Sequence, residues 1–519
     1  MNNYYQILCL VLFVVLAPLA SATVKDCSAI KGLSDDKLRI QLTEKVPASA
    51  DLPEYCRVIG VIDPKIGFEI RLPTKDWNGK FYMVGCGGFC GVIKSDAPGF
   101  ANRINYGLKR NYAVATTDSG HRMKSNWEAA WALNNRFAEF NWGHRAIHKT
   151  TNVTKRVIAR YYGQKPNRSY FAGCSTGGRM AAMEALRYPN DFDGIIAGAP
   201  GLNYTSLVGS YFAWMMQHNT DENGNEIIAQ ADVPIINQYL FKECDGKDGL
   251  RDGLIDDPRA CNFRPEKIMC TRNKTTNCLS KKQVDAVKKL HEIPRNSIGE
   301  PLFAGRNTVG SSYYWPKWLS STGIKVAESP LLIPKIGRNF LRYMAFDEDP
   351  GESYSPLDFD FDFDPPKMDL MGKVYNSDNP DLSEFKQKGG KFLLWHGWSD
   401  TVIPPGITID YYERMIQLNG SLDATQDFAR FFLFPGMDHC GAFPGRGAQQ
   451  NGFDILSALE NWVENDTAPD KLMSTKYDRQ GNEVWTRPVC AYPNIAKYQG
   501  GNSTKQESFE CQRNGFTHH

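Results

Sequence analysis

A serine set between glycines is the first candidate for chemistry. Residues 173–177 (GCSTG) fit Gly-x-Ser-x-Gly, a pattern in which a strand turns sharply into a helix and presents a nucleophilic serine. The apolar residues 169–172 precede this turn and the helical pattern of residues 179–187 follows it. We therefore predict Ser175 as a nucleophile, with the backbone amide of Thr176 donating to the oxyanion. The alternative is a plain glycine-rich turn.

Such a serine needs an orienting acid and a base, which follow it in the chain order Asp, His. Two of the nine histidines, His396 and His439, follow late apolar segments in suitable loops. Asp400 comes four residues after His396, so that loop is better suited to supply the acid. We predict Asp400 as the orienting acid and His439 as the base.

Two rival assignments stay open. His396 is the other candidate base, although we interpret it as a hydrogen-bonded structural histidine. Asp438 is the other candidate acid, but it directly precedes His439, and a sequence neighbour has poor geometry for bonding that imidazole.

Two cysteines flank the predicted nucleophile and base. Cys174 immediately precedes Ser175, and Cys440 immediately follows His439. If Ser175 and His439 form a hydrogen bond, the cysteines come close enough to form a disulfide, which needs Cα atoms roughly 4.4–6.8 Å apart. Such a bridge would limit drift of the two side chains, and positioning errors of about 1 Å can cost on the order of 100-fold in rate. Two unrelated structural cysteines are the alternative.

Short apolar segments alternate with helical patterns and would position these residues. The predicted buried strands are residues 67–72, 80–84, 112–116, 169–172, 194–197, 391–395 and 429–434. Helical patterns lie between them, as at residues 179–187 and 454–463. This alternation predicts an α/β fold with a mostly parallel sheet that is covered on both faces.

Residues 204–388 interrupt this alternation of strand and helix patterns. They hold four cysteines, an acidic loop and few clear strands. We predict an insertion in the place where a lid would sit, between a first part of the core at residues 23–203 and a second part at residues 389–519.

The composition is that of an ordinary globular protein, with 42% hydrophobic and 23% charged residues, which excludes a disordered, collagen-like or coiled-coil chain. Lys and Arg number 60 and Asp and Glu number 58, so the net charge is only +2. A nearly neutral chain lacks the broad field that holds nucleic acid or acidic lipid, and we expect neither partner.

The first 22 residues resemble a secretory signal peptide. Residues 7–16 form an apolar run too short to span a bilayer, and Ala20-Ser21-Ala22 gives a small-x-small cleavage pattern. An uncleaved anchor is the alternative. The 12 cysteines that remain beyond Cys9 allow up to six bridges, as in an exported protein. We expect a secreted protein, extracellular or periplasmic, with sequons at Asn152, Asn167, Asn203, Asn273, Asn419, Asn465 and Asn502 that are glycan sites if the host glycosylates.

An acidic, glycine-rich loop covers residues 244–254 (CDGKDGLRDGL). Carboxylates on a flexible loop suit Ca²⁺, which prefers hard oxygen ligands. The loop is not an EF-hand, because its acidic spacing differs and no Glu closes it. The residues alone leave an ion site and a solvated turn equally open.

Four motifs of the chain resemble the tannase and feruloyl esterase family. They are GCSTGG at 173–178, YPNDFDGIIAGAP at 188–200, GGKFLLWHGWSD at 389–400 and FPGMDHCG at 434–441. Adjacent Cys-Ser and His-Cys pairs are a hallmark of that family. The resemblance implies an α/β-hydrolase core with a large lid domain, and it implies hydrolysis of esters of hydroxylated aromatic acids, either small or linked to polysaccharide.

The resemblance also implies further site residues. The family takes an oxyanion donor from the loop at residues 85–91 (GCGGFCG), where Gly88 is the best match. Ile403 stands where the family often places an apolar group facing the acyl ring, although a packed core isoleucine is an equal alternative.

The acidic loop resembles the family's calcium loop. The implied ligands are the side chains of Asp245, Asp248 and Asp252 and the backbone carbonyls of Leu250 and Leu254. Cys244 and Cys261 would close this loop. Spacing and resemblance together pair Cys270 with Cys278 and Cys490 with Cys511. Cys27–Cys56 and Cys86–Cys90 are the candidate pairs for the other four cysteines, whose pairing stays open.

Three other functions stay open. They are a general secreted carboxylesterase or lipase, a peptidase on the same core, and a binding module without activity. The intact set of Ser175, Asp400 and His439 argues against the last of these.

Overall fold

Nine strands form one mixed sheet in the computed structural model, which describes residues 25–96 and 103–513. The strand order is β1-β2-β3-β5-β4-β6-β7-β8-β9. The strands are β1 (Leu38–Val46), β2 (Tyr55–Ile62), β3 (Ile66–Pro73), β4 (Lys80–Val84), β5 (Ala113–Thr117), β6 (Arg168–Cys174), β7 (Gly194–Gly198), β8 (Lys391–Gly397) and β9 (Ala429–Phe434). Neighbours from β1 to β5 pair antiparallel, and neighbours from β5 to β9 pair parallel.

All the predicted strands are present, and the parallel half of the sheet confirms the prediction of alternating strands and helices. Strands β1 and β2 were not predicted. The first residues of β1 do alternate between apolar and polar, with Leu38, Ile40 and Leu42 as the apolar set, but this pattern stops at the polar residues 43–45 of this edge strand. The predicted signal peptide at residues 1–22 lies outside the described residues.

Helices cover both faces of the sheet. Helices α3 (Ala146–Tyr162) and α4 (Thr176–Arg187) pack on one face, and α15 (Ile455–Asn465) packs on the other. Side chains of a strand alternate between the faces, so Phe171 of β6 belongs to the core on the α4 side and Tyr170 to the core on the α15 side. The short helices α1 (Asn105–Leu108) and α2 (Arg136–Phe140) complete the first part of the chain.

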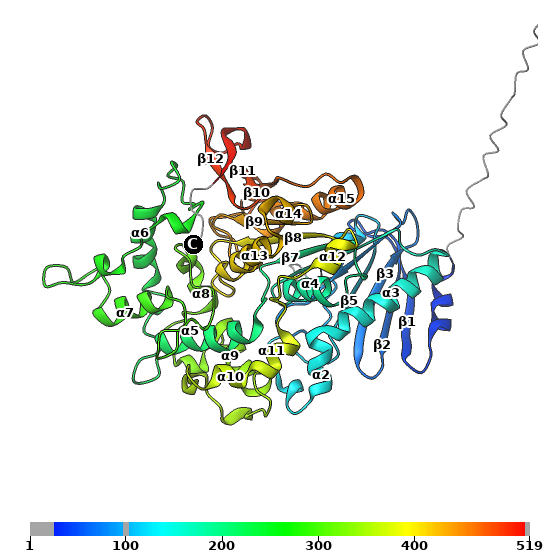
Figure 1. Ribbon diagram of the computed structural model, residues 1–519, viewed down its shortest axis with the longest axis horizontal. Helices are drawn as coiled ribbons and strands as arrows, with labels where there is room; N and C mark the ends of the chain where they lie inside the picture. Colours follow the sequence, from blue (N-terminus) through cyan, green and yellow to red (C-terminus); the bar gives the residue numbers. More distant parts are fainter. Residues whose placement is uncertain (1–24, 97–102, 514–519) are drawn as a thin grey trace, which may run out of the picture.

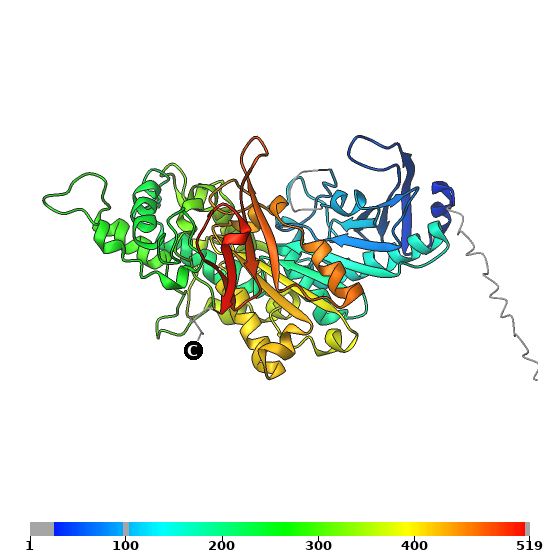
Figure 2. The same cartoon turned by 90° about the horizontal axis from the view of Figure 1, so that it is seen from above.

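A helical segment separates β7 from β8 in the sequence, and most of it lies to one side of the sheet, in green to yellow in Figures 1 and 2. Its helices are α5 (Phe212–His218), α6 (Val233–Cys244), α7 (Lys281–Leu290), α8 (Trp315–Trp318), α9 (Leu332–Tyr343), α10 (Asp364–Lys367), α11 (Asp369–Tyr375) and α12 (Ser383–Gln387). Strands β7 and β8 are nevertheless paired neighbours in the sheet. The segment therefore lies where the insertion of residues 204–388 is predicted, and the domain boundaries themselves stay a prediction.

The last part of the chain adds two hairpins that were not predicted. After α13 (Gly406–Asn419) and α14 (Leu422–Gln426), strands β10 (Lys471–Tyr477) and β11 (Glu483–Cys490) form one hairpin, and β12 (Asn494–Tyr498) and β13 (Phe509–Arg513) form the other. Both are separate from the main sheet and appear in orange to red in Figure 1. Within the two described ranges, no helix is both long and apolar enough to cross a membrane.

Six disulfides are present within the described residues. They include the four pairs expected from spacing and resemblance, and they also give the pairing of the four cysteines that the sequence left open. They are Cys27–Cys56, Cys86–Cys90, Cys174–Cys440, Cys244–Cys261, Cys270–Cys278 and Cys490–Cys511.

Candidate active site

Ser175 occupies a tight turn between β6 and α4. Its φ and ψ angles of 64° and −125° are strained for a residue with a side chain, which marks a position held in place by its surroundings. The turn has no room for larger neighbours, because a Cβ atom added to Gly173 would lie 2.3 Å from the carbonyl group of Gly177. The half-buried Ser175 donates its backbone N–H to Gly198 of the next strand at 3.0 Å. The geometry is that of the predicted strand-to-helix turn.

His439 and Asp400 are brought together from the loops that follow β9 and β8. Nδ1 of His439 lies 2.8 Å from Oδ2 of Asp400, and the two side chains are 2% and 0% exposed. The other carboxylate oxygen accepts the backbone N–H groups of Val402 and Ile403 at 2.9 Å and 2.8 Å. Burial alone would raise the pKa of Asp400, but the charge of His439 and hydrogen bonds from His396 and His439 lower it to about 2. The carboxylate is therefore ionised and oriented.

His396 has the surroundings of a structural histidine. It is fully buried, with Nδ1 2.8 Å from the Thr408 hydroxyl and Nε2 2.7 Å from the Ile403 carbonyl. Its Nε2 atom also lies 3.3 Å from Oδ2 of Asp400. Both ring nitrogens of His396 therefore have hydrogen-bond partners within the protein.

Asp438, the rival acid, forms its hydrogen bond with the backbone of Phe443. Its carboxylate accepts the backbone N–H of Phe443 at 3.2 Å. Burial and the charge of Asp400 raise its pKa well above the ordinary value. This carboxyl group is poorly suited to hold a histidine cation.

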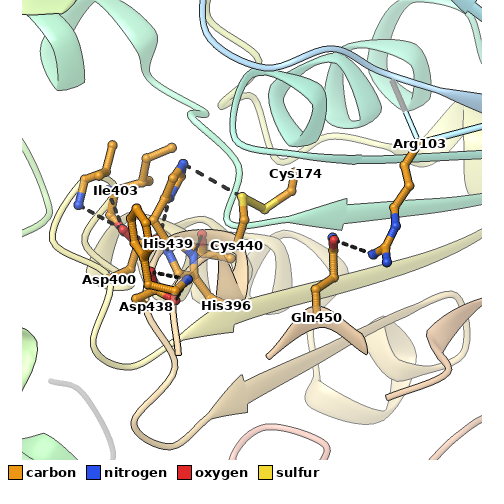
Figure 3. The surroundings of a disulfide bond; sticks show 12 residues. Arg103, Cys174, His396, Asp400, Ile403, Asp438, His439, Cys440 and Gln450 are labelled. Atoms are coloured by element: carbon orange, nitrogen blue, oxygen red, sulfur yellow. Dashed lines mark hydrogen bonds and ion pairs between the residues drawn. A yellow bond between two sulfur atoms is a disulfide. The ribbon is translucent and has the colours of Figure 1, made fainter. Parts of the chain in front are cut away.

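The Cys174–Cys440 disulfide links the nucleophile turn with the His439 loop. Its Cα atoms are 6.0 Å apart, and the cysteines are the residue before Ser175 and the residue after His439. Figure 3 shows the bridge beside the imidazole of His439, and Sγ of Cys440 lies 3.8 Å from its Nε2 atom. The bridge therefore holds the serine and histidine backbones at neighbouring positions, on the side of the ring opposite to Asp400.

The glycine-rich loop of residues 85–91 follows β4 and meets the nucleophile turn. Gly88 has a positive φ of 59° and lies too close to Trp127 and Asn126 for a side chain to fit. The Thr176 hydroxyl donates to the Gly88 carbonyl at 2.7 Å. The two residues predicted as oxyanion donors are thus in direct contact, although sequence spacing alone does not reveal this hydrogen bond.

Ile403 lies close to the nucleophile turn and is 3% exposed. Its Cδ1 atom is 3.6 Å from the place of a Cβ atom on Gly201, and the Gly201 amide lies 3.4 Å from the Ser175 carbonyl. Ile403 also contributes to the site through its backbone, which bonds Asp400 and His396.

Trp318 was not predicted as a site residue. It belongs to α8 of the insertion, and its ring stands edge-on to His439 with centroids 5.9 Å apart and an interplanar angle of 87°. It also packs against Phe443 at 4.9 Å. No motif surrounds Trp318, so only the folded chain reveals that the insertion reaches His439.

The acidic loop is closed by Cys244–Cys261 and has oxygen donors that suit calcium. Its carboxylates bind loop amides: Asp245 accepts from Gly253, Asp248 from Leu250 and Asp252 from Leu254, at 2.8–3.0 Å. Burial raises the pKa of Asp248, and the nearby charges of Asp252 and Asp245 add to this effect. Within the described ranges, no group of three or more His, Cys, Asp or Glu side chains is assembled as a metal site. The oxygen donors thus suit calcium, and binding would require the side chains of Asp245, Asp248 and Asp252 to turn toward one ion.

Known proteins resemble this chain over most of its length. The model of the family described as "Tannase and feruloyl esterase" matches residues 54–512. A mono(2-hydroxyethyl) terephthalate hydrolase of Piscinibacter sakaiensis is 33% identical over 89% of this chain and 86% of its own length. Feruloyl esterase B of Aspergillus niger is 27% identical over 95% of this chain and 93% of its own length.

The crystal structure of feruloyl esterase B from Aspergillus oryzae has a TM-score of 0.82 and 25% sequence identity with this chain. The match covers 94% of this chain and 99% of that one. This similarity confirms the α/β-hydrolase fold that the sequence resemblance implies.

Proposed function

Because the chain belongs to the tannase and feruloyl esterase family and is a carboxylic ester hydrolase, we propose that it hydrolyses esters of hydroxylated aromatic acids through Ser175, His439 and Asp400. The observation that carries this proposal is the buried contact of His439 with Asp400, linked to the Ser175 turn by Cys174–Cys440.

The first step forms an acyl-enzyme. His439 removes the proton of the Ser175 hydroxyl as that oxygen attacks the ester carbonyl carbon. Asp400, which is ionised and bonded to Nδ1, stabilises the imidazolium that results. The protonated histidine then donates its proton to the leaving alcohol as the ester C–O bond breaks.

The second step releases the aromatic acid. His439 deprotonates a water molecule, which attacks the acyl carbon, and the proton returns to the Ser175 oxygen as the serine–acyl bond breaks. In both steps negative charge develops on the carbonyl oxygen. The backbone amides of Thr176 and Gly88 would donate to this oxygen, and the contact between these residues supports their joint role.

Apolar and aromatic groups beside the reacting residues support an aromatic acid as substrate. Ile403 lies next to the serine turn, and Trp318 of the insertion packs against His439. The relatives named above are a terephthalate monoester hydrolase and a feruloyl esterase, both of which act on esters of aromatic acids. In this proposal the insertion acts as a lid that contributes to the acyl pocket.

Two further features belong to the same proposal. The chain is exported, which the apolar residues 7–16 and the six disulfides support. A calcium ion is held by Asp245, Asp248 and Asp252 with the carbonyls of Leu250 and Leu254. This ion would stabilise the insertion and take no part in the reaction.

A substrate panel with matched variants tests the proposed function. The chain should hydrolyse methyl ferulate or methyl gallate faster than fatty-acyl esters or peptides, and a fluorophosphonate probe should label Ser175. Ser175→Ala should lower kcat at least about 1,000-fold. Ser421→Ala, which removes the N-cap of α14, is the control and should retain the parent rate. A preference for fatty-acyl esters would favour a general carboxylesterase or lipase, and absence of labelling would favour a binding module.

A further inference from the structure

The glycine-rich loop of residues 85–91 carries a disulfide of its own. Cys86 and Cys90 are bridged, with Cα atoms 5.5 Å apart, and they are only 2% and 1% exposed. The bridge encloses Gly87, Gly88 and Phe89. Two consecutive glycines have unusually many accessible backbone conformations, so an unbridged loop of this sequence would order its amides poorly.

The Cys86 end of the bridge packs against the nucleophile helix. Its Sγ atom lies 4.0 Å from Sδ of Met180, which is on α4, and 3.3 Å from the Ser119 hydroxyl. A Cβ atom added to Gly177 would lie 3.2 Å from the Cys86 carbonyl. This end of the loop therefore rests on the helix whose first residue is Thr176.

The Cys90 end is held by the segment that follows β5. The Phe89 amide donates to the Asn126 carbonyl at 2.7 Å, and the Gly91 amide donates to the Asp118 carbonyl at 3.0 Å. The ring of His121 lies directly against Gly91 and stacks on Trp131 with centroids 3.7 Å apart. The Cys86–Cys90 bridge thus encloses the part of the loop that lies between the contact with α4 and the contacts with the segment after β5.

Backbone hydrogen bonds already occupy several amides of the loop. Gly85 donates to Ala172, Phe89 to Asn126, and Cys90 to Gly87 within the loop itself, at 2.7–3.1 Å. The Gly88 carbonyl in turn accepts the Thr176 hydroxyl. These contacts and the bridge together leave Gly88 little freedom to move relative to Thr176, the residue that follows Ser175.

We propose that the Cys86–Cys90 disulfide is a positioning element that fixes the oxyanion-binding amide of Gly88 beside Ser175. This inference rests on the proposed function. Preorganised donors stabilise a developing oxyanion without a reorganisation cost, whereas a displacement of about 1 Å can cost on the order of 100-fold in rate. Loss of the bridge should therefore weaken stabilisation of the transition state more than binding of the substrate.

The test compares two double variants of the full chain. Cys86→Ala/Cys90→Ala should lower kcat for the best ester of the panel by about tenfold or more, with KM within about twofold of the parent value. Cys270→Ala/Cys278→Ala removes a bridge in the insertion between cysteines 8 residues apart and should retain the parent kcat. The melting temperature of each variant separates a loss of positioning from a loss of folding.

A second readout is specific to the oxyanion. A thionoester places sulfur, a weaker hydrogen-bond acceptor, where the ester places oxygen. The parent should strongly prefer the ester over its thionoester analogue, and Cys86→Ala/Cys90→Ala should reduce this preference. Were the ester and thionoester rates to fall equally, or were the control variant to lose the same activity, the positioning role would be wrong.

The remaining outcomes are also decisive. Full kcat in Cys86→Ala/Cys90→Ala would overturn the inference. If that variant does not fold, Cys86→Ser/Cys90→Ser takes its place, and failure of both to fold would assign the bridge to stability rather than positioning. An inactive parent chain would instead contradict the proposed function.

Discussion

His439 and His396 meet on a single atom, Oδ2 of Asp400, at 2.8 Å and 3.3 Å. Their other contacts differ. His396 is enclosed by the Thr408 hydroxyl and the Ile403 carbonyl, whereas His439 lies beside the disulfide that leads to Ser175. One carboxylate thus contacts both the histidine next to the Cys174–Cys440 bridge and a second histidine whose two ring nitrogens are hydrogen-bonded within the protein.

The two histidines should respond differently to substitution. His439→Ala should lower kcat at least about 1,000-fold with little change in stability, because it removes the base. His396→Ala should chiefly lower the free energy of unfolding, by roughly 1–3 kcal/mol, because it leaves buried polar partners without a hydrogen bond. Steady-state kinetics and urea denaturation of both variants check this. An active His439→Ala enzyme would contradict the assignment of the base.

The two candidate acids provide a matched pair. Asp400→Asn should lower kcat by roughly 10⁴-fold, because the amide does not hold the imidazole in the required tautomer or stabilise its cation. Asp438→Asn should cost less than about tenfold, because that carboxyl group bonds the Phe443 amide instead. Measurement of kcat for both variants at one pH shows which of the two carboxyl groups orients His439. The reverse order of effects would reassign the acid.

The bridge between the serine and histidine loops should matter for rate. Cys174→Ala/Cys440→Ala should lower kcat by about 100-fold, because the loops are then free to separate by about 1 Å. Cys490→Ala/Cys511→Ala, which removes a bridge near the C-terminal hairpins, is the control and should retain kcat. A Cys174→Ala/Cys440→Ala enzyme at full rate would refute the positional argument.

The free energy of unfolding should fall as the pH rises from about 4.5 to about 7, because Glu139 has a higher pKa in the folded chain than in the unfolded chain. Burial raises the pKa of this side chain to about 7, against the lowering effects of a Tyr375 hydrogen bond and the Arg136 charge, while Asp349 adds to the rise. In that pH window the folded chain binds a proton that the unfolded chain has already lost, so unfolding becomes easier as the pH rises.

Glu139→Gln should flatten this pH dependence, because the variant has no proton to release. The free energy of unfolding of both proteins, measured by urea denaturation at several pH values, checks the prediction. Tyr375 belongs to α11 of the insertion and bonds Glu139 of α2 at 2.6 Å, so the effect concerns how the insertion is fastened to the core. An equal slope in both proteins would exclude Glu139 as its source.

Removal of calcium should lower stability and leave the chemistry intact. Chelation should reduce the melting temperature by several degrees, because an ion that binds only the folded state stabilises it. Fluorophosphonate labelling of Ser175 below that temperature should be unchanged. Asp248→Asn should remove most of the chelator effect, whereas Asp362→Asn, at an exposed carboxylate of the insertion, should not. Elemental analysis that finds no bound calcium would contradict the site.

Much of the core could be predicted from sequence because its signals are local. A strand, a glycine pair and a helical pattern identify the Ser175 turn, and the cysteines beside Ser175 and His439 predict a contact between distant segments. The edge strand β1 has only a short signal of this kind, because its alternation of apolar and polar residues stops at the polar residues 43–45. Trp318 could not be predicted, because its contact with His439 depends on how the insertion packs against the His439 loop.

Strands β7 and β8 are hydrogen-bonded neighbours, with Gly198 opposite Trp395, although the entire insertion separates them in the sequence. Because the two strands are parallel, the insertion starts beyond the carboxyl end of β7 and returns at the amino end of β8, so its two ends are attached to neighbouring strands of one rigid support. A segment attached in this way can lengthen, shorten or be exchanged between homologous chains without any shift in strand register. Under the proposed function, substrate range and bond-breaking chemistry are thus free to evolve at different rates within this architecture.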